Sequence, residues 1–157
     1  MIEDVTLHSF SYQHPPMKFE AGTPMIAEVI GLGEAIHFIE SIGRHKIAAW
    51  EQQLLEYATK RLREIKGLRI IGTAPKKGAI LSFVVDDLHP LDIGTLLDIR
   101  GIAVRTGQLC AQPTLKCFNL NSMTRVSFGI YNTFEEIDIF VEALKEVILL
   151  LNPSLSY

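Results

Sequence analysis

The stretch RTGQLCAQP, residues 105–113, combines the residue types that could support thiol chemistry. It places Cys110 in a loop with Gly107 before it and Pro113 after it, five positions beyond Arg105. A cysteine reacts as its thiolate, which needs access to solvent and a nearby positive charge. The residues alone leave two interpretations of Cys110 open: a reactive thiol at a strand exit, or a small buried apolar side chain.

Arg125 is the second candidate, because it lies inside the apolar run TRVSFGI, residues 124–130. The run alternates as a strand does, so we expect Arg125 and Ser127 on one face and Val126 on the other. A guanidinium in such a strand needs an anion or access to solvent. A substrate carboxylate held by two hydrogen bonds would satisfy it, and so would the open side of a sheet.

Other chemically active side chains favour structural roles. Cys117, in the run LKCFNL, is flanked by apolar residues, and we expect it to pack as a buried thiol. The two cysteines and five histidines lack the spacing of a zinc site, so no metal is expected. Lys46 is expected in solvent at a helix start, and the adjacent Asp86 and Asp87 are expected to form a turn or cap a helix.

The elements that must position these residues follow from periodicity and capping signals. A helix is expected from Thr23, as the N-cap, to about Ser41. Thr133 and Glu136 have the spacing of a capping box at the start of the last helix. Two more helices are expected at 44–65 and 90–100, a strand hairpin at 68–72 and 78–85, and further strands at 102–104 and 124–130.

This order predicts an α+β fold of two layers, in which helices pack on one face of a small, mostly antiparallel sheet. The length suits one compact domain, which we assign to residues 23–157. Residues 1–22 contain a strand-like run with no partner hairpin and are expected to form an extended tail.

Composition argues against several classes of partner. The net charge is -3 and the sequence pI is near 5.9, so the chain has no basic field for nucleic acid or an anionic membrane. Apolar runs are too short to span a membrane, and the first residues lack the pattern of a signal peptide. Two cysteines are too few for a disulfide framework, so we expect a cytoplasmic protein with reduced thiols.

Three separated motifs resemble, in order and spacing, the C-terminal part of cysteine desulfurases of the Suf type, in the class V aminotransferase family. They are KFEAGTP (18–24), IAVRTGQLCAQP (102–113) and TRVSFGIYNTFEEID (124–138). The resemblance implies the C-terminal small domain of a fold-type I pyridoxal phosphate enzyme. Residues 1–22 would then be the tail of a large domain that the chain lacks.

In that family, pyridoxal phosphate on a lysine of the large domain holds L-cysteine, and a loop cysteine attacks its sulfur. The products are L-alanine and a persulfide, which passes to an acceptor protein of the SufE or SufU type for iron–sulfur cluster assembly. The resemblance makes Cys110 the nucleophile, Arg125 the carboxylate-binding residue, and Arg105 a loop arginine near the substrate. It makes Thr23 a contact to the cofactor phosphate of the neighbouring subunit in a homodimer.

The chain departs from the family pattern in two ways. Gln108 and Leu109 stand where the family commonly has a histidine between glycine and cysteine, so a neighbouring imidazole is lost. None of the eight lysines matches the cofactor lysine, and we expect a fragment that is inactive alone. The alternatives are a non-enzymatic persulfide carrier or partner-binding domain, and a selenocysteine lyase or other class V relative.

Overall fold

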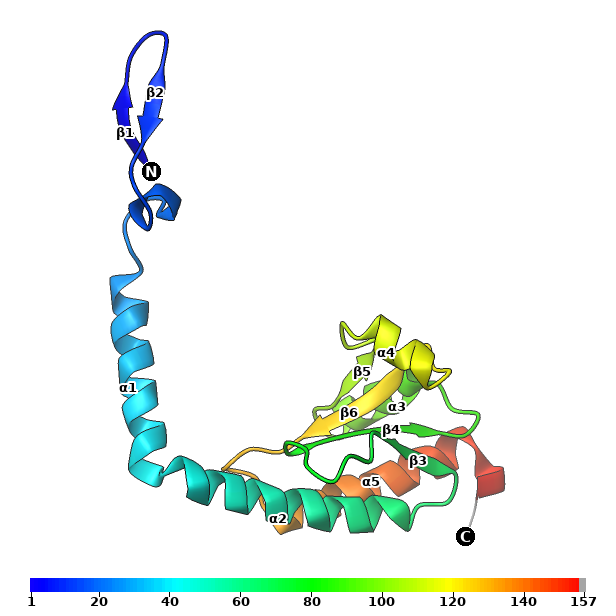
Figure 1. Ribbon diagram of the computed structural model, residues 1–157. Coiled ribbons are helices and arrows are strands. Elements are labelled where there is room, and N and C mark those ends of the chain that lie inside the picture. Colours follow the sequence, from blue (N-terminus) through cyan, green and yellow to red (C-terminus); the bar gives the residue numbers. More distant parts are fainter. Residues whose placement is uncertain (156–157) are drawn as a thin grey trace. The chain divides into compact units, whose positions relative to one another are not determined.

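The computed structural model describes residues 1–155 and divides into two units, Met1–Arg44 and His45–Tyr157 (Figure 1). This division falls after the first long helix, whereas the sequence suggested a boundary after residue 22. Within residues 1–155, the structure has no helix that combines the length and the apolar composition of a membrane span.

The N-terminal unit begins with a β-hairpin and not with the extended tail expected from the sequence. Strand β1 (Ile2–Val5) pairs antiparallel with β2 (Phe10–Tyr12). The Thr6 hydroxyl closes the turn by accepting the Ser9 amide at 3.0 Å, and the Thr6 amide donates to the Ser9 carbonyl at 2.8 Å. A side-chain-supported turn of this kind has no glycine or asparagine signature, so the sequence pattern indicates one continuous strand-like run and does not reveal the turn.

Helix α1 (Ile26–Ile42) follows a short 3₁₀ turn, η1 (Met17–Phe19). It begins later than expected: Met25 is the N-cap, with no side-chain capping bond, and Thr23 precedes the helix. The Ile26 amide donates to the Pro24 carbonyl at 2.9 Å, which places Pro24 in a turn before the first helical residue. Exposed apolar side chains surround the helix on all sides: Ile26, Val29, Ile30, Leu32, Ile36, Phe38 and Ile39.

The second unit contains a four-stranded sheet in which every neighbouring pair is antiparallel. Its order is β3-β4-β6-β5. The bounds are β3 (Leu68–Ile71), β4 (Ile80–Val85), β5 (Arg105–Gly107) and β6 (Met123–Ser127). The expected hairpin is confirmed as β3 and β4, with Leu68 opposite Val85.

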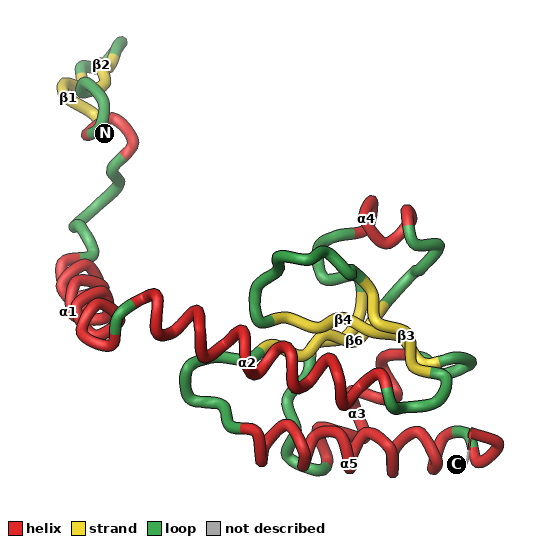
Figure 2. The backbone as a smooth tube through the Cα atoms, turned by 60° about the horizontal axis from the view of Figure 1, so that its bottom comes forward, coloured by secondary structure: helices red, strands yellow, loops and turns green. Residues whose placement is uncertain are grey.

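Three helices cover one face of this sheet: α2 (Arg44–Arg63), α3 (Pro90–Ile99) and α5 (Phe134–Leu151) (Figure 2). Every second residue of the central strands faces them, including the fully buried Leu81 and Phe83 and the nearly buried Val126. Phe83 meets Phe140 of α5 with ring centroids 6.4 Å apart. The two-layer α+β prediction is therefore confirmed, and the opposite face of the sheet contains Arg105, Arg125 and Ser82.

A polar cluster joins helices α2 and α5 at their surface. The Asp138 carboxylate accepts a hydrogen bond from the Tyr57 hydroxyl at 2.8 Å and pairs with Arg61 at 2.6 Å. Arg61 also donates to Glu142 at 3.2 Å. The hydrogen bond to Asp138 and burial raise the pKa of Tyr57 above its usual range, because both disfavour the phenolate. Helix α5 is thereby held against α2 by its polar edge as well as by the core.

Helix α3 ends in a way that determines where β5 begins. Gly101 has a φ of 75°, and its amide donates to the Asp98 carbonyl at 2.8 Å. The Ile102 amide donates to the Leu97 carbonyl at 3.0 Å, which completes a Schellman motif. Ile102 is thus used to close the helix and cannot join the sheet, so the strand expected at 102–104 forms instead at Arg105–Gly107.

Helix α5 has the capping box that its sequence predicted. The Thr133 hydroxyl accepts the Glu136 amide at 3.2 Å, and the Glu136 carboxylate accepts the Thr133 amide at 3.1 Å. Asn132 adds a side-chain bond to the same carboxylate at 3.0 Å and accepts the Gly129 amide at 2.8 Å. The Asn132 amide and the Thr133 amide lower the pKa of Glu136, because both hydrogen bonds favour its charged form.

Candidate functional site

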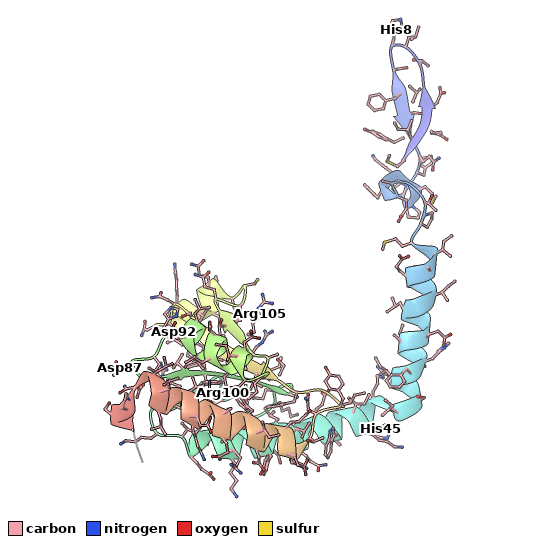
Figure 3. All side chains as sticks on the ribbon, turned by 180° about the vertical axis from the view of Figure 1, so that it is seen from behind. His8, His45, Asp87, Asp92, Arg100 and Arg105 are labelled. Carbon is pink, nitrogen blue, oxygen red and sulfur yellow. The ribbon has the colours of Figure 1, made fainter. Side chains whose placement is uncertain are left out.

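Arg105 and Arg125 form a cross-strand pair. They are register partners on β5 and β6, so their side chains leave the same face of the sheet, the face without α2, α3 and α5. Ser82 of β4 is the register partner of Arg125 on its other side. Arg105 is exposed, and Figure 3 shows it beside the sheet, while Arg100 lies at α5 with its guanidinium 3.5 Å from Glu146. Two cations side by side attract an anion to this face.

Arg125 has an unmet hydrogen-bonding requirement. It is half-buried, and its Nε lies away from solvent without a hydrogen-bond partner among the described residues. Val126 next to it is buried on the helix side. The sequence-based expectation that these two residues face opposite ways is therefore confirmed. A buried guanidinium N–H without an acceptor is costly, and a carboxylate or phosphate oxygen would supply the acceptor.

The strand that presents Arg105 packs closely on helix α3. A Cβ added at Gly94 would lie 2.5 Å from the Thr106 Cγ2 atom, so only glycine allows this approach. Thr106 is the register partner of the fully buried Thr124. Sequence patterns do not link Gly94 or Ser82 to this site. Gly94 lies against Thr106 of β5, and Ser82 is the register partner of Arg125 on β6, so each relationship depends on a residue of another element.

Cys110 lies in a tight turn that follows β5. The Ala111 amide donates to the Gln108 carbonyl at 2.9 Å, and the two residues between them, Leu109 and Cys110, both have a φ of 55°. Positive φ at both central positions is the signature of a type I′ turn, which normally contains asparagine or glycine. The Cys110 side chain is exposed, which removes the buried alternative for this thiol.

Cys117 was expected to be buried, and this is wrong: its side chain is exposed. It lies at the end of a short helix, α4 (Gln112–Cys117), which the sequence patterns did not predict. Leu115 is the one buried residue of α4, and its carbonyl accepts the Leu120 amide at 3.0 Å, with Asn119 at a φ of 56° closing the helix. A helix this short has one buried position and therefore no amphipathic period, so the Cys117 side chain points outward with a bond to the Pro113 carbonyl at 3.4 Å.

The remaining predicted residues belong to other elements of the chain. Thr23 belongs to the N-terminal unit and is exposed there, whereas Cys110, Arg105 and Arg125 belong to the second unit. Lys46 is exposed on the first turn of α2, as expected. Within residues 1–155, no group of three or more histidine, cysteine, aspartate or glutamate side chains could hold a metal ion.

Comparison with known proteins gives the family of the chain. The family model of class-V aminotransferases matches residues 1–140. A probable cysteine desulfurase of Mycolicibacterium paratuberculosis is 52% identical over 147 residues, which cover 94% of this chain and 22% of that protein. Across three such relatives the chain spans between 22% and 36% of their length.

Solved structures agree with this assignment. The cysteine desulfurase CsdA from Escherichia coli matches 96% of this chain and 37% of its own, with a TM-score of 0.84 and 33% identity. A variant of C-DES with glycine covalently linked to its pyridoxal phosphate cofactor has the same fold, with a TM-score of 0.68, 21% identity, and coverage of 83% of this chain and 31% of its own. The chain therefore belongs to the class-V aminotransferase family and is homologous to the C-terminal part of cysteine desulfurases.

Proposed function

We propose that this chain is the substrate-binding and sulfur-accepting part of a pyridoxal phosphate-dependent cysteine desulfurase. The observation that carries the proposal is the Arg105–Arg125 pair on the open face of the sheet. Arg105 lies on β5, and this strand leads directly into the turn that contains Cys110. Arg125 and Arg105 would bind the carboxylate of L-cysteine, and Cys110 would accept its sulfur.

The electrostatics of the open face support binding of an amino-acid carboxylate. A guanidinium presents parallel N–H groups that match the two oxygens of a carboxylate. The unpartnered Nε of Arg125 provides such a donor, and Arg105 adds a second positive charge that would hold the negative end of the substrate. The same charge would favour the thiolate form of a cysteine brought near it.

The conformation of the turn at Cys110 favours a reactive role for this thiol over a role as a packing side chain. Non-glycine residues with positive φ cost free energy, and such strain gathers at functional sites. Leu109 and Cys110 both take this conformation, and the Cys110 side chain faces solvent. An exposed thiol on a preformed turn can meet a substrate on one side and an acceptor protein on the other.

The family uses pyridoxal phosphate. We propose that this chain does not hold that cofactor covalently by itself. A Schiff base needs a lysine, and none of the eight lysines lies on β5, in the 108–111 turn or on β6. Lys116 is the nearest to these elements in sequence, and it is exposed on α4. Thr23, by its resemblance to the family, would contact the cofactor phosphate of the neighbouring subunit in a homodimer.

The sulfur transfer balances as a reaction of two thiols. The Cys110 thiolate would form a bond to the sulfur of L-cysteine, and the carbon–sulfur bond would break with its electron pair going to the carbon. Pyridoxal phosphate, when bound, would supply the electron sink for that pair. The carbon would take up the proton that the Cys110 thiol lost, which gives L-alanine and a persulfide on Cys110. An acceptor protein of the SufE or SufU type would then remove the outer sulfur for iron–sulfur cluster assembly.

Helix α1 supports the view that the chain works within a larger assembly. Helices with apolar side chains on all sides are buried in proteins, and α1 has this composition. We therefore propose that the chain alone does not turn over L-cysteine, and that α1 packs against the rest of a longer enzyme or a homodimer partner.

A domain exchange tests this function. The matching part of E. coli CsdA is replaced by this chain, and L-alanine release from L-cysteine is measured with pyridoxal phosphate present. We expect turnover by the hybrid, none by the 157-residue chain alone, loss of turnover in Cys110→Ser, and retained turnover in the matched control Cys117→Ser. Turnover by the chain alone, or a Cys110→Ser hybrid as active as its parent, would refute the proposal. A persulfide found on Cys110 without any turnover by the hybrid would favour a carrier over an enzyme.

A further inference from the structure

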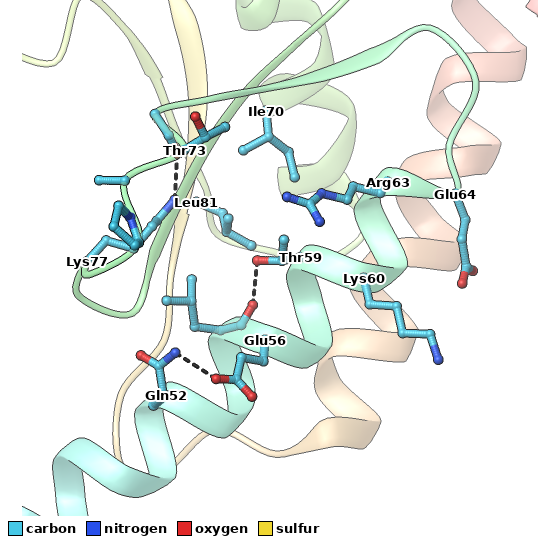
Figure 4. Close-up of a pocket in the computed structure, with 14 residues that line it drawn as sticks. Gln52, Glu56, Thr59, Lys60, Arg63, Glu64, Ile70, Thr73, Lys77 and Leu81 are labelled. Carbon is cyan, nitrogen blue, oxygen red and sulfur yellow. Dashed lines mark hydrogen bonds between the residues drawn. The ribbon is translucent and has the colours of Figure 1, made fainter.

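A charged pocket lies between α2 and the connection from β3 to β4 (Figure 4), and neither Arg105 nor Arg125 lines it. Its volume is about 510 Å³, which is within the range of small-molecule sites. It borders β3 and β4, whereas Arg105 and Arg125 lie on the other two strands of the sheet. Leu55, Ile70 and Leu81 provide apolar surface in its lining.

The charges that face into this pocket are positive. Figure 4 shows the Arg63 guanidinium directed inward toward Ile70, while the charged ends of Lys60 and Glu64 point outward. Lys77 enters from the other side, on the β3–β4 connection, and its ammonium donates to the Gly72 carbonyl at 3.0 Å. Arg63 of α2 and Lys77 of the connection thus line the same pocket from two elements.

The acidic residues of the lining do not neutralise these two cations. The Glu56 carboxylate accepts a hydrogen bond from the Gln52 amide at 2.8 Å, and Glu64 lies 3.9 Å from Arg61 on the outer side of α2. Neither Arg63 nor Lys77 has an ion pair within residues 1–155. Partial burial lowers the pKa of Lys77, and the charge of Arg63 lowers it further, so the ammonium lies in a place that lacks a counterion.

We propose that this pocket binds a small organic oxyanion, either a carboxylate or a phosphate ester, with a compact apolar body. The Arg63 guanidinium would bind two oxygens of the anion, and the Lys77 ammonium would act as a point charge opposite it. The apolar body would contact Leu55, Ile70 and Leu81, and the Thr59 hydroxyl lies in the same lining. A ligand here would connect α2 to the β3–β4 hairpin.

Titration of the full 157-residue chain with phenyl phosphate, benzoate and inorganic phosphate, followed by amide NMR, tests this site. We expect saturable shifts at Thr59, Gly72 and Thr73, and tighter binding of the aromatic probes than of inorganic phosphate. The stronger of phenyl phosphate and benzoate identifies which oxyanion the site prefers. Shifts confined to the amides of Arg105 and Thr106 would mean that only the arginine pair binds anions, which would overturn the proposal.

Matched variants identify the groups responsible. Arg63→Gln and Lys77→Gln should each weaken binding at these amides about tenfold, as loss of a charge-assisted bond does. Lys60→Gln removes a charge of the same helix that points outward, so it should change binding less than about twofold. Lys77→Arg should keep the affinity for the probes, because it keeps a positive charge at position 77. Circular dichroism shows whether each variant is folded, so that a loss of affinity can be assigned to the lost charge. Unchanged affinity in the double variant of Arg63 and Lys77, or equal affinity for inorganic phosphate and phenyl phosphate, would contradict the proposed ligand.

Discussion

Arg105 and Arg125 lie directly opposite one another on neighbouring antiparallel strands, and no carboxylate within residues 1–155 pairs with either. Like charges in this arrangement repel, which lowers the stability of the fold. Such a pair is retained when an anion is its natural partner, and the buried Nε of Arg125, which has no hydrogen-bond partner among the described residues, points to the same requirement. The pair therefore lowers the stability of the free protein and favours the binding of an anion.

Replacing Arg125 by methionine should raise the free energy of unfolding by about 1 kcal/mol, because repulsion and an unpartnered buried N–H are both removed. Urea denaturation measures the change. Arg69→Met is the matched control, since Arg69 is exposed on the same face of the sheet opposite Val84 and should give little change. A clear loss of stability in Arg125→Met would show that the guanidinium is stabilising as it stands.

Replacing Cys110 by glycine should stabilise the chain by about 0.5–1 kcal/mol, because glycine adopts positive φ without a steric cost. The exposed thiol contributes little packing that could be lost. Thermal denaturation of the reduced protein measures the gain, with Cys117→Ala as the control for thiol removal at an ordinary helical position. Equal melting temperatures in all three proteins would argue that the turn is not strained.

Gly94→Ala should destabilise the second unit by about 1–3 kcal/mol, the usual cost of overpacking, because the added methyl group meets the Thr106 Cγ2 atom at 2.5 Å. Thr106→Ser removes that carbon atom while keeping the hydroxyl. The double variant should recover most of the loss in a double-mutant cycle. Additive effects of the two changes would mean that the contact is not the cause.

The capping box of α5 should make stability depend on pH in the acid range. Hydrogen bonds lower the folded-state pKa of Glu136 below its ordinary value of 4.5, so its stabilising effect is present above that pH. The effect is lost as the pH falls through the lower folded-state value. Glu136→Gln should flatten this part of the stability profile, whereas Glu135→Gln in the same first turn should leave it in place. Thr133→Ala should cost about 1 kcal/mol at neutral pH, since it removes the other half of the box.

Local signals predicted the elements that depend on neighbouring residues in the chain. The spacing of Thr133 and Glu136 gave the start of α5, and the alternation of the run at 124–130 gave the opposite directions of Arg125 and Val126. Both features arise within a few residues, so a linear sequence contains them. The hairpin of β3 and β4 was predicted for the same reason, from two alternating runs and a turn.

Features that depend on tertiary context or unusual turns were not predicted. The β1–β2 turn is closed by the Thr6 side chain, and the Cys110 turn has positive φ without glycine or asparagine, so neither has a typical composition. Cys117 points outward because Leu115 is the buried residue of the six-residue helix α4. A helix this short has no repeating apolar pattern that a sequence could reveal. The pairing of Arg105 with Arg125 needed the register of two strands that are far apart in the sequence.

The single tryptophan of the chain lies where it can report on the folding of this domain. Trp50 donates from its indole nitrogen to the Asn132 carbonyl at 3.3 Å and meets Phe134 edge to face, with ring centroids 5.2 Å apart. It therefore connects the N-terminal half of α2 to the start of α5. Its fluorescence spectrum should shift when α5 detaches, so the native chain contains its own optical probe and needs no attached dye.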